Sequence, residues 1–397
     1  MLDAPPYQRS GALQLQELPP LALYVHFPWC LKKCPYCDFN SHPQRAGAGN
    51  AALHTRYVQS LLTDIESCLP LVWGRRIISV FLGGGTPSLF APELIADFLS
   101  RARALLPFAP GCEITLEANP GTFEKARFAA YRAAGVTRLS IGVQSFNDKL
   151  LAAIGRVHDG AQARAAAEEA ARHFEQFNLD LMYALPGQNV QEWQEDLNIA
   201  LSFAPPHLST YQLTLEEGTP FAKKPPQLPD DDAACAMMDT SDAACAAAGL
   251  QRYEVSAWAR RGCQCTHNLN YWQFGDYLGI GAGAHGKISF THCIIRHERA
   301  RQPEQYMQAA LSGNAVENER QVTLRELPFE YMLGALRLKN GFEMGDFCAR
   351  TGLPPSAVLP TLQDAAQRGW LHEDSGHWMP TARGFDFLSD VQQLFLP

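Results

Sequence analysis

Short runs of apolar and β-branched residues alternate with longer helical segments over roughly the first half of the chain. The six short runs are the predicted strands, at residues 21–27, 77–82, 113–118, 138–144, 179–185 and 207–213. Runs of this length, bounded by turn residues, are typical of buried strands. Because the segments between them are long enough for a helix, the pattern predicts repeated βα units and a parallel sheet.

The intervening segments are rich in Ala, Leu and Glu and carry apolar residues at helical spacing. We expect helices at residues 54–69, 92–106, 123–134, 160–174 and 190–203, with Gly135 as the C-terminal cap of the third. Right-handed crossovers between parallel strands allow an open doubly wound sheet or a barrel, complete or partial. Both α/β architectures place ligands at the carboxyl ends of the strands.

The rest of the chain predicts smaller units. We expect a surface connection at 218–229, a helix at 231–248, and further strands beside the barrel in YEVSAWA and DYLGIGAGAHG. From about Thr323 the pattern changes to helices, a tight turn at Arg368-Gly369 and a short apolar wing, which resembles a winged helix. The predicted division is an N-terminal extension (1–20), a barrel (21–250), a barrel extension with HNLNYW (251–322) and a mostly helical C-terminal domain (323–397).

The charge balance argues against a protein that binds nucleic acid. The formal net charge is -8, and residues 323–397 hold six Lys or Arg against nine Asp or Glu. An acidic winged domain would be repelled by phosphate, which favours packing or docking to a partner protein. The chain has neither a spanning apolar run of about 18 residues nor a signal peptide, so we expect a cytoplasmic protein with at most peripheral membrane association.

Eleven cysteines on a chain of this kind favour a metal or redox role over a disulfide framework. Cys30, Cys34 and Cys37 follow the first predicted strand at spacings that let three thiolates converge from one loop. Thiolates are the ligands of iron–sulfur clusters, and three of them leave one iron of a four-iron cluster open. The alternative is structural zinc, which would need a fourth ligand such as His26, Asp38 or His42.

Polar and glycine-rich segments follow the later strands. GGGTPS (residues 83–88) follows the second strand and lets backbone amides approach a ligand, while the absence of a following Lys argues against a phosphate loop. Glu117, Gln144, Arg156 and Asp180 lie at or near the ends of later strands. A carboxylate there could bind hydroxyl or ammonium groups and Arg156 a carboxylate, although each could equally be a structural hydrogen-bonding residue.

The spacing Cys-x-x-x-Cys-x-x-Cys, with Tyr36 before the third cysteine, resembles the signature of the radical-SAM superfamily. The resemblance implies a [4Fe-4S] cluster on Cys30, Cys34 and Cys37 and S-adenosylmethionine bound to its open iron. It also implies that Tyr36 packs on the adenine and that the glycine-rich turn holds the methionine amino group.

Further motifs resemble the oxygen-independent coproporphyrinogen III oxidases and their relatives over nearly the whole chain. They are YVHFPWC, GGGTPS, LEANPGT, GVQSF, DLMYALPGQ, HNLNYW and GIGAGAHG. The resemblance implies a partial (β/α)6 barrel. By position it assigns a first S-adenosylmethionine to Tyr24, Gly84 and Glu117, and a second to Tyr36, Gly85, Thr86, Gln144, Arg156 and Asp180.

Two departures separate the chain from the oxidases. Phe39 stands where they carry a further cysteine, and only 29 residues precede Cys30. Phe39 and HNLNYW are instead similar to a sister group of haem chaperones. This implies haem as cargo, apo-cytochromes or other haemoproteins as recipients, a homodimer, and no oxidase activity. The alternatives are radical decarboxylation of coproporphyrinogen III and another radical-SAM reaction.

HNLNYW supplies the candidate haem-binding residues His267, Asn268, Tyr271 and Trp272. An imidazole can ligate haem iron, and the two large aromatic side chains offer flat apolar area to a macrocycle. The alternative is a loop histidine beside packed aromatic residues. His285 in GAGAHG is a weaker rival, and we expect His26 to form a hydrogen bond beside the cluster.

Overall fold

The computed structural model describes residues 13–44, 50–121 and 127–397. Its framework is a run of six parallel strands in the order of the chain. They are β1 (Leu21–Phe27), β4 (Ile77–Gly84), β5 (Phe108–Ala118), β6 (Arg138–Gln144), β7 (Gln176–Tyr183) and β8 (His207–Gln212). Parallel pairing of successive strands requires a crossover between each pair, and helices supply these crossovers.

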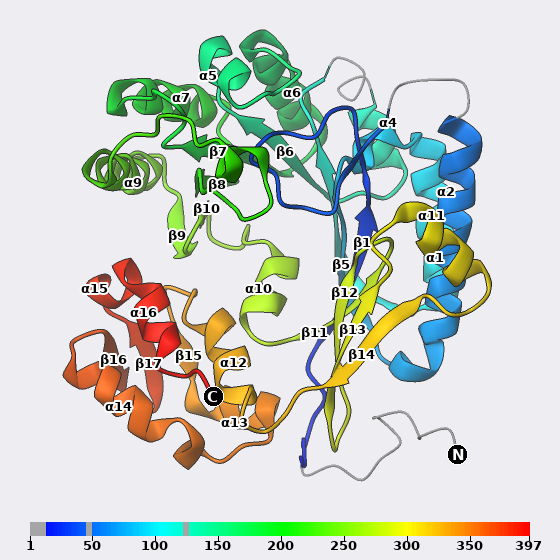
Figure 1. Cartoon of the computed structure of the whole chain (residues 1–397), viewed down its shortest axis with the longest axis vertical. Helices are drawn as coiled ribbons and strands as arrows, with labels where there is room; N and C mark the ends of the chain where they lie inside the picture. The colour runs from blue at the N-terminus through cyan, green and yellow to red at the C-terminus, as the bar shows by residue number, and fades with distance from the viewer. Residues whose placement is uncertain (1–12, 45–49, 122–126) are drawn as a thin grey trace.

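The crossover helices cover the outer face of the sheet (Figure 1). They include α1 (Asn50–Val72), α2 (Pro92–Leu105), α4 (Phe128–Ala133), α6 (Gly160–His173) and α7 (Val190–Ser202), with α5 (Asp148–Ala153) and α9 (Asp231–Ala247) beside them. Their apolar faces and the outward side chains of the strands form the main hydrophobic core. Gly135, which adopts φ +104° just after α4, is the predicted cap. The start of the helix predicted at 123–134 and most of the predicted N-terminal extension lie outside the described residues.

The barrel is partial because its first and last strands pair with other strands rather than with each other. β1 pairs on its far side with β11 (Asp276–Ile280), and β8 pairs with β10 (Ala257–Ala259). The sheet continues through β12 (His285–Ser289), β13 (Ile294–Arg299) and β14 (Val316–Gln321) at one end and β9 (Gln251–Glu254) at the other. This topology confirms the predicted fold class and decides between the alternatives that the sequence left open.

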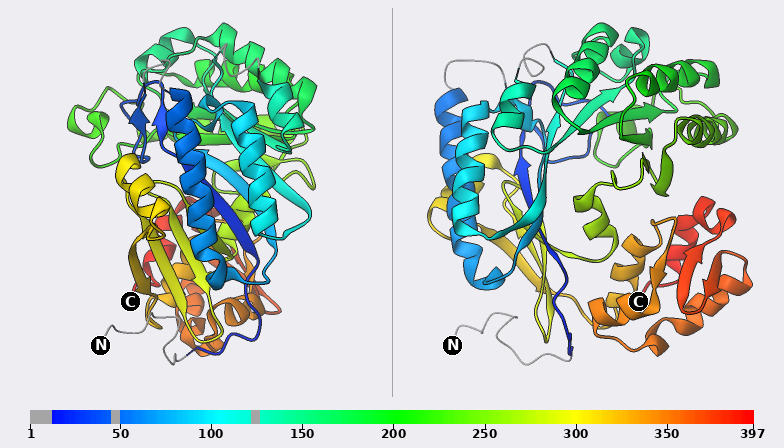
Figure 2. Two further views of the ribbon diagram at one scale, coloured as in Figure 1. Left: turned by 90° about the vertical axis from the view of Figure 1, so that its right-hand side faces the viewer. Right: turned by 180° about the vertical axis from the view of Figure 1, so that it is seen from behind.

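The HNLNYW motif lies on a short helix, α10 (Thr266–Trp272), in place of the loop considered above. This helix rests on the inner face of the sheet against β4, β1 and β11 (Figure 2). Backbone amides of Thr266 and His267 at its first turn donate to Oε1 of Glu113, at 2.9 and 3.4 Å. A carboxylate in this position is stabilised by the unpaired amides of a helix start.

Several element boundaries differ from the predictions. The strand predicted at 179–185 ends instead at Tyr183, because Ala184 adopts a left-handed backbone with φ +56° that a strand cannot continue. The connection predicted at 218–229 contains one helical turn, α8 (Pro220–Lys223), which Thr219 caps by accepting a hydrogen bond from the Ala222 amide. Local capping chemistry explains this turn.

The C-terminal domain combines short helices with a small antiparallel sheet. The helices α12 (Leu327–Ala335), α13 (Met344–Thr351), α14 (Leu359–Gln367), α15 (Ala382–Asp386) and α16 (Leu388–Gln393) accompany β15 (Phe342–Glu343), β16 (Leu371–Asp374) and β17 (His377–Pro380). Gly369 takes φ +75° at the predicted turn before the wing. A separate hydrophobic core, to which Leu13 and Leu15 contribute, holds this domain together. The arrangement confirms the predicted winged-helix-like fold.

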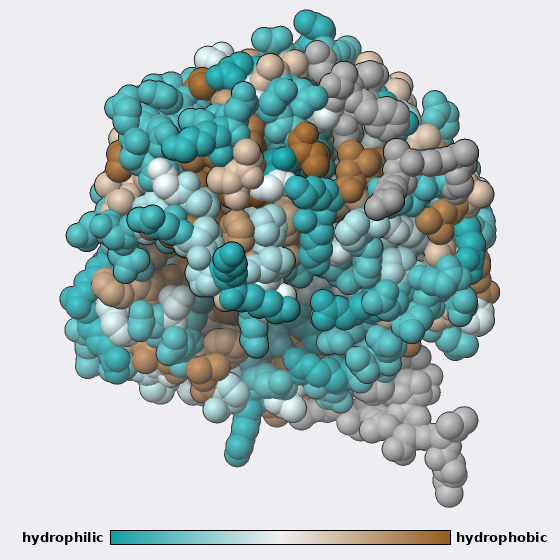
Figure 3. All heavy atoms as spheres, turned by 45° about the horizontal axis from the view of Figure 1, so that its top comes forward, coloured by the Kyte–Doolittle hydropathy of each residue, from teal (hydrophilic) through white to brown (hydrophobic). Residues whose placement is uncertain are grey.

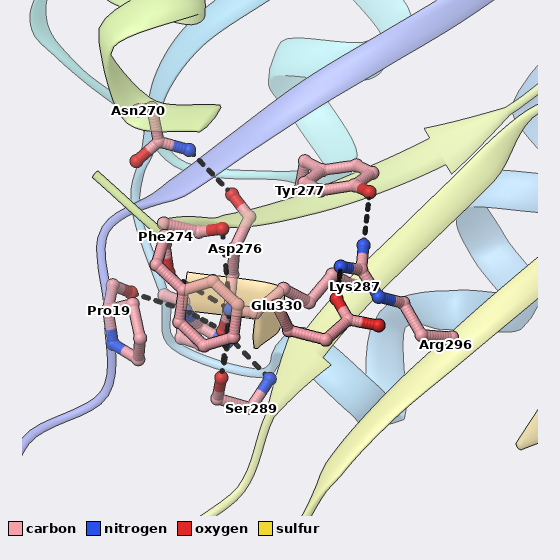
Figure 4. Close-up of polar contacts among 11 residues, drawn as sticks. Pro19, Asn270, Phe274, Asp276, Tyr277, Lys287, Ser289, Arg296 and Glu330 are labelled. Carbon is pink, nitrogen blue, oxygen red and sulfur yellow. Dashed lines mark hydrogen bonds and ion pairs between the residues drawn. The ribbon is translucent and has the colours of Figure 1, made fainter. Parts of the chain in front are cut away.

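A buried charged network joins α10, the barrel and the strands of the extension (Figure 4). Asp276 accepts hydrogen bonds from Lys287 Nζ at 2.8 Å and from the amide and hydroxyl of Ser289 at 2.9 and 2.8 Å, and it pairs with Arg75 at 2.8 Å. The backbone carbonyl of Asp276 accepts from Asn270 Nδ2 of α10 at 2.8 Å. Every carboxylate oxygen therefore has a partner, as a buried charge requires.

A second polar contact connects the C-terminal domain to the barrel extension. Arg296 of β13 donates to the hydroxyl of Tyr277 and pairs with Glu330 of α12 (Figure 4).

No helix among the described residues is long and apolar enough to cross a membrane.

Candidate functional site

The three cysteines lie on the loop that leaves the carboxyl end of β1. Two short parallel strands, β2 (Trp29–Cys30) and β3 (His42–Pro43), close this loop at its base. Within it, the Cys37 amide donates to the Cys34 carbonyl at 3.2 Å. Cys30, Cys34 and Cys37 all line one cavity of about 590 Å³, which we call the first cavity.

Each thiol has a polar neighbour. Thr86 Oγ1 lies 3.4 Å from Cys30 Sγ, Arg156 Nη1 lies 3.8 Å from Cys34 Sγ, and Ser41 Oγ lies 3.8 Å from Cys37 Sγ. Burial raises the pKa of the Cys30 and Cys37 thiols. Binding of iron must therefore provide the positive charge that favours the thiolate form.

The donor set fits a four-iron cluster. Among the residues that the structure describes, no three His, Cys, Asp or Glu side chains meet closely enough to share one metal ion. A [4Fe-4S] cluster does not ask for this, because each thiolate binds a different iron. Three sulfur donors from one loop face a cavity large enough for a cluster and a small-molecule ligand.

The residues predicted for two S-adenosylmethionine molecules sort into two adjoining cavities. The first cavity holds, beside the cysteines, Tyr36, Gly85, Thr86, Gln144, Arg156 and Asp180. A second cavity of about 350 Å³ is lined by Tyr24, Gly84 and Glu117, of which Gly84 and Glu117 also line the first. The fold therefore brings all nine predicted residues to the lining of these two cavities.

A chain of hydrogen bonds connects Arg156 to the cluster loop. Arg156 Nη2 donates to Asn119 Oδ1 and to the Gly142 carbonyl, both at 2.6 Å. Asn119 Nδ2 donates to Thr86 Oγ1 at 2.8 Å, and Thr86 in turn lies against Cys30. The sequence predictions missed Asn119, although its place after Glu117 in LEANPGT was a signal that could have found it.

Backbone constraints act at two residues of the first cavity, Gln144 and Gly85. Gln144 adopts φ +67° at the end of β6, where the pairing with β7 shifts register. A residue other than glycine in this region is strained and is often found at functional sites. Gly85 is required by space, because a Cβ there would lie 2.6 Å from the Trp29 carbonyl oxygen. These features let the glycine-rich turn pack directly on the cluster loop.

Glu117 and Asp180 are half-buried carboxyl groups that line the first cavity, and Glu117 also lines the second. Glu117 Oε2 accepts a hydrogen bond from the Gly84 amide at 3.0 Å. Burial and the charge of Asp180 together raise the pKa of Glu117 to about 7. Burial also raises the pKa of Asp180, although hydrogen bonds from Ser140 and Asn178, at 2.9 and 2.8 Å, oppose this. Glu117 can therefore exchange a proton near neutral pH.

His26 connects the inner face of β1 to the cluster loop. Its Nδ1 lies 3.0 Å from the Tyr24 hydroxyl and its Nε2 lies 2.9 Å from the carbonyl of Asn40. Burial lowers the pKa of His26 to about 4, so the ring is neutral at pH 7. This geometry agrees with the predicted hydrogen bond beside the cluster.

The four HNLNYW candidates face different surroundings. His267 is 3% exposed, and burial lowers its pKa to about 3. Its Nδ1 lies 3.1 Å from Ser79 Oγ, and its ring stacks on Phe81. Tyr271 lines the second cavity and stacks on Tyr277. Trp272 lies under the guanidinium of Arg337, 4.2 Å from the ring centre. Asn268 is half-buried. The motif thus presents one side chain, Tyr271, to a cavity.

Comparisons with known proteins agree with this architecture. The family model of the radical SAM superfamily matches residues 24–200, and that of the HemN C-terminal domain matches residues 322–387. Among solved structures, coproporphyrinogen III oxidase (HemN) from Escherichia coli superposes with a TM-score of 0.80 over 95% of this chain and 90% of that one, at 24% identity. This likeness concerns the fold.

Curated relatives extend the likeness to the sequence. The heme chaperone HemW of Escherichia coli is 45% identical over 382 residues, which cover 96% of this chain and 99% of the relative. HemW of Haemophilus influenzae is 44% identical over 96% of this chain and 99% of its own length. Bovine radical S-adenosyl methionine domain-containing protein 1, mitochondrial, is 43% identical over 67% of this chain and 60% of its own length. The chain therefore belongs to the radical-SAM superfamily and, within it, to the family of HemW.

Proposed function

We propose that the protein is a haem chaperone, which binds haem and passes it to apo-haemoproteins such as respiratory cytochromes. The observation that carries this proposal is 45% identity to a heme chaperone along 99% of that relative's length. The site adds support, since Phe39 replaces the further cysteine of the oxidases and is 58% exposed where both cavities meet.

The cluster and S-adenosylmethionine belong to the first cavity in this proposal. Cys30, Cys34 and Cys37 would hold the cluster, which when bound supplies an iron with an open coordination site. Arg156, fixed by Asn119 and Gly142, presents a guanidinium beside Cys34, where it favours negative charge. Gly84, Gly85 and Thr86 bring backbone close to the loop without a bulky side chain between.

We place the protein in the cytoplasm, where thiols stay reduced; the structure contains free cysteines at all eleven positions. Figure 3 brings the end with the cluster loop forward and shows a largely hydrophilic surface with small, separate hydrophobic patches. Such a surface suits at most peripheral membrane contact during delivery. A homodimer remains part of the proposal through the family resemblance.

Two assays on one preparation test the proposed function. The chain is reconstituted anaerobically with iron and sulfide, titrated with ferric haem, and followed by the Soret band. The same sample receives coproporphyrinogen III, S-adenosylmethionine and a reductant. We expect stable haem uptake and no conversion to protoporphyrinogen. Turnover without haem uptake would contradict the chaperone and support the oxidase.

Binding of S-adenosylmethionine should strengthen as the pH rises. The ligand carries positive charge, so it favours ionised Glu117, and a pKa of about 7 means that the proton must leave first. Between pH 6 and pH 8 we expect an affinity gain of about tenfold, following the ionised fraction. Calorimetric titration of the reconstituted protein measures it. Glu117→Gln should flatten the profile, while the control Glu113→Gln on the same strand should keep it.

A further inference from the structure

The second cavity is lined by groups that recognise a metalloporphyrin. His285, at the start of β12, has a side chain 68% exposed and lines this cavity. Neither nitrogen of its ring makes a hydrogen bond to the residues that the structure describes, so one is free for a metal. Phe39, Tyr271 and Arg301 line the same space. We infer that haem, in place of the S-adenosylmethionine predicted for Tyr24, Gly84 and Glu117, binds here with Nε2 of His285 as the ligand to iron. The inference rests on the proposed function and names its site.

A carboxylate stands behind the imidazole. Glu298 of β13 lies directly across the ladder from His285, with Oε1 3.8 Å from Nδ1. Asn318 of β14 holds the other oxygen of Glu298 through Nδ2 at 3.2 Å. Histidines that bind metals commonly direct their second nitrogen to a carboxylate, which orients the ring and strengthens it as a ligand. Here the arrangement leaves Nε2 for iron.

His267 lacks this access. Its Nδ1 is already paired with Ser79, and its Nε2 is a fully buried atom that lines neither cavity. To reach an iron, α10 would have to leave the inner face of the sheet. That movement would break the bonds from Thr266 to Glu113 and from Asn270 to Asp276, at 2.9 and 2.8 Å. The packing of α10 against the sheet therefore favours His285 as the ligand, with HNLNYW contributing Tyr271.

Two aromatic side chains and one guanidinium in the lining suit the rest of the macrocycle. Phe39 and Tyr271, which are far apart in the sequence, both provide aromatic surface. Arg301 has a guanidinium that can bind a propionate through two hydrogen bonds. Phe39, His285 and Arg301 are exposed, so the cavity opens to solvent. A haem inserted by one edge would keep the other edge accessible, as transfer to a recipient requires.

The cluster loop forms one wall of this haem site. Asn40 Nδ2 donates to the carbonyls of Ala282 and Arg301, at 2.9 and 2.8 Å. Gly283 is required beside it, since a Cβ there would lie 2.4 Å from Asn40 Nδ2. Asp38, Phe39, Gly84 and Glu117 line both cavities. Occupancy of the first cavity therefore changes haem affinity in the second, and the effect is reciprocal.

Haem titration of histidine variants tests the ligand. The full-length, reconstituted protein is titrated with ferric haem as wild type, His285→Ala, His267→Ala and His372→Ala, the last an exposed histidine of the C-terminal domain. We expect His285→Ala to weaken binding at least about tenfold and to change the Soret band. Added imidazole should restore the band. His267→Ala and His372→Ala should keep the wild-type spectrum.

A second variant covers the case in which His285→Ala does not fold. His285→Met replaces the nitrogen ligand by sulfur, so a shifted band is expected and an unshifted one counts against the site. A wild-type spectrum and affinity in His285→Ala would overturn the inference. Loss of the band in folded His267→Ala alone would return the ligand to α10. If the wild-type protein takes up no haem, the proposed function itself fails.

Discussion

Cys34→Ala is expected to leave the protein without its [4Fe-4S] cluster. Only Cys30 and Cys37 would remain as ligands. Two irons of the cluster, rather than one, would then lack a protein ligand. Cys34 is also the buried member of the three and lies beside Arg156. Iron and acid-labile sulfide per chain, with the absorbance near 400 nm, give the measurement after anaerobic reconstitution.

Cys235→Ser is the matched control for this result, because Cys235 is exposed on α9 and lines neither cavity. It should retain iron, sulfide and the spectrum of the wild-type protein. The Cys34→Ala protein should also bind S-adenosylmethionine weakly, since it lacks the open iron. A full complement of iron and sulfide in Cys34→Ala would rule out the assigned ligand set.

Asp276→Ala is expected to cost about 3–5 kcal/mol of unfolding free energy, the usual result of leaving a buried charge without its partner. Asp276 and Lys287 are both buried, and Arg75 and Ser289 share the same carboxylate. Burial by itself would raise the pKa of Asp276, but Lys287 and Arg75 outweigh it and hold the pKa below its ordinary value. Burial lowers the pKa of Lys287 to about 8, so both groups are charged at pH 7.

The sign of the pH dependence follows from the lowered pKa of Asp276. The stability that ionised Asp276 contributes is complete above the ordinary carboxyl pKa and is lost as the pH falls through the pKa of the folded state. The free-energy cost of Asp276→Ala should therefore be constant from about pH 5 to pH 7 and become smaller in stronger acid. Urea unfolding followed by circular dichroism measures it. Asp97→Ala, in an exposed pair with Arg101, should change stability by less than about 0.5 kcal/mol. Equal costs for the two variants would refute the argument.

The strands were largely readable from local pattern. β1 and β6 begin and end at the predicted residues, because each is a β-rich run closed by turn or polar residues. The observed β7 begins and ends earlier than the strand predicted at 179–185. The predicted start is too late because the first residues of β7 include polar side chains such as Asn178, and the predicted end is too late because of the backbone conformation of Ala184. A strand that borders a polar barrel interior loses the continuous apolar signal on which the prediction relies.

By itself, the sequence determined the parallel βα architecture, and it predicted Cys30, Cys34 and Cys37 as the cluster ligands and the polar residues near the strand ends. Both depend on local spacing and periodicity. Only the tertiary structure decided that the barrel stays open, that Tyr24 belongs to a different cavity from Tyr36, and that Asn119 joins Arg156 to Thr86. It also distinguished a buried His267 from an exposed His285. These features arise from contacts between segments that are distant in the sequence. Burial and strand pairing determine such contacts, and the neighbouring residues in the sequence do not.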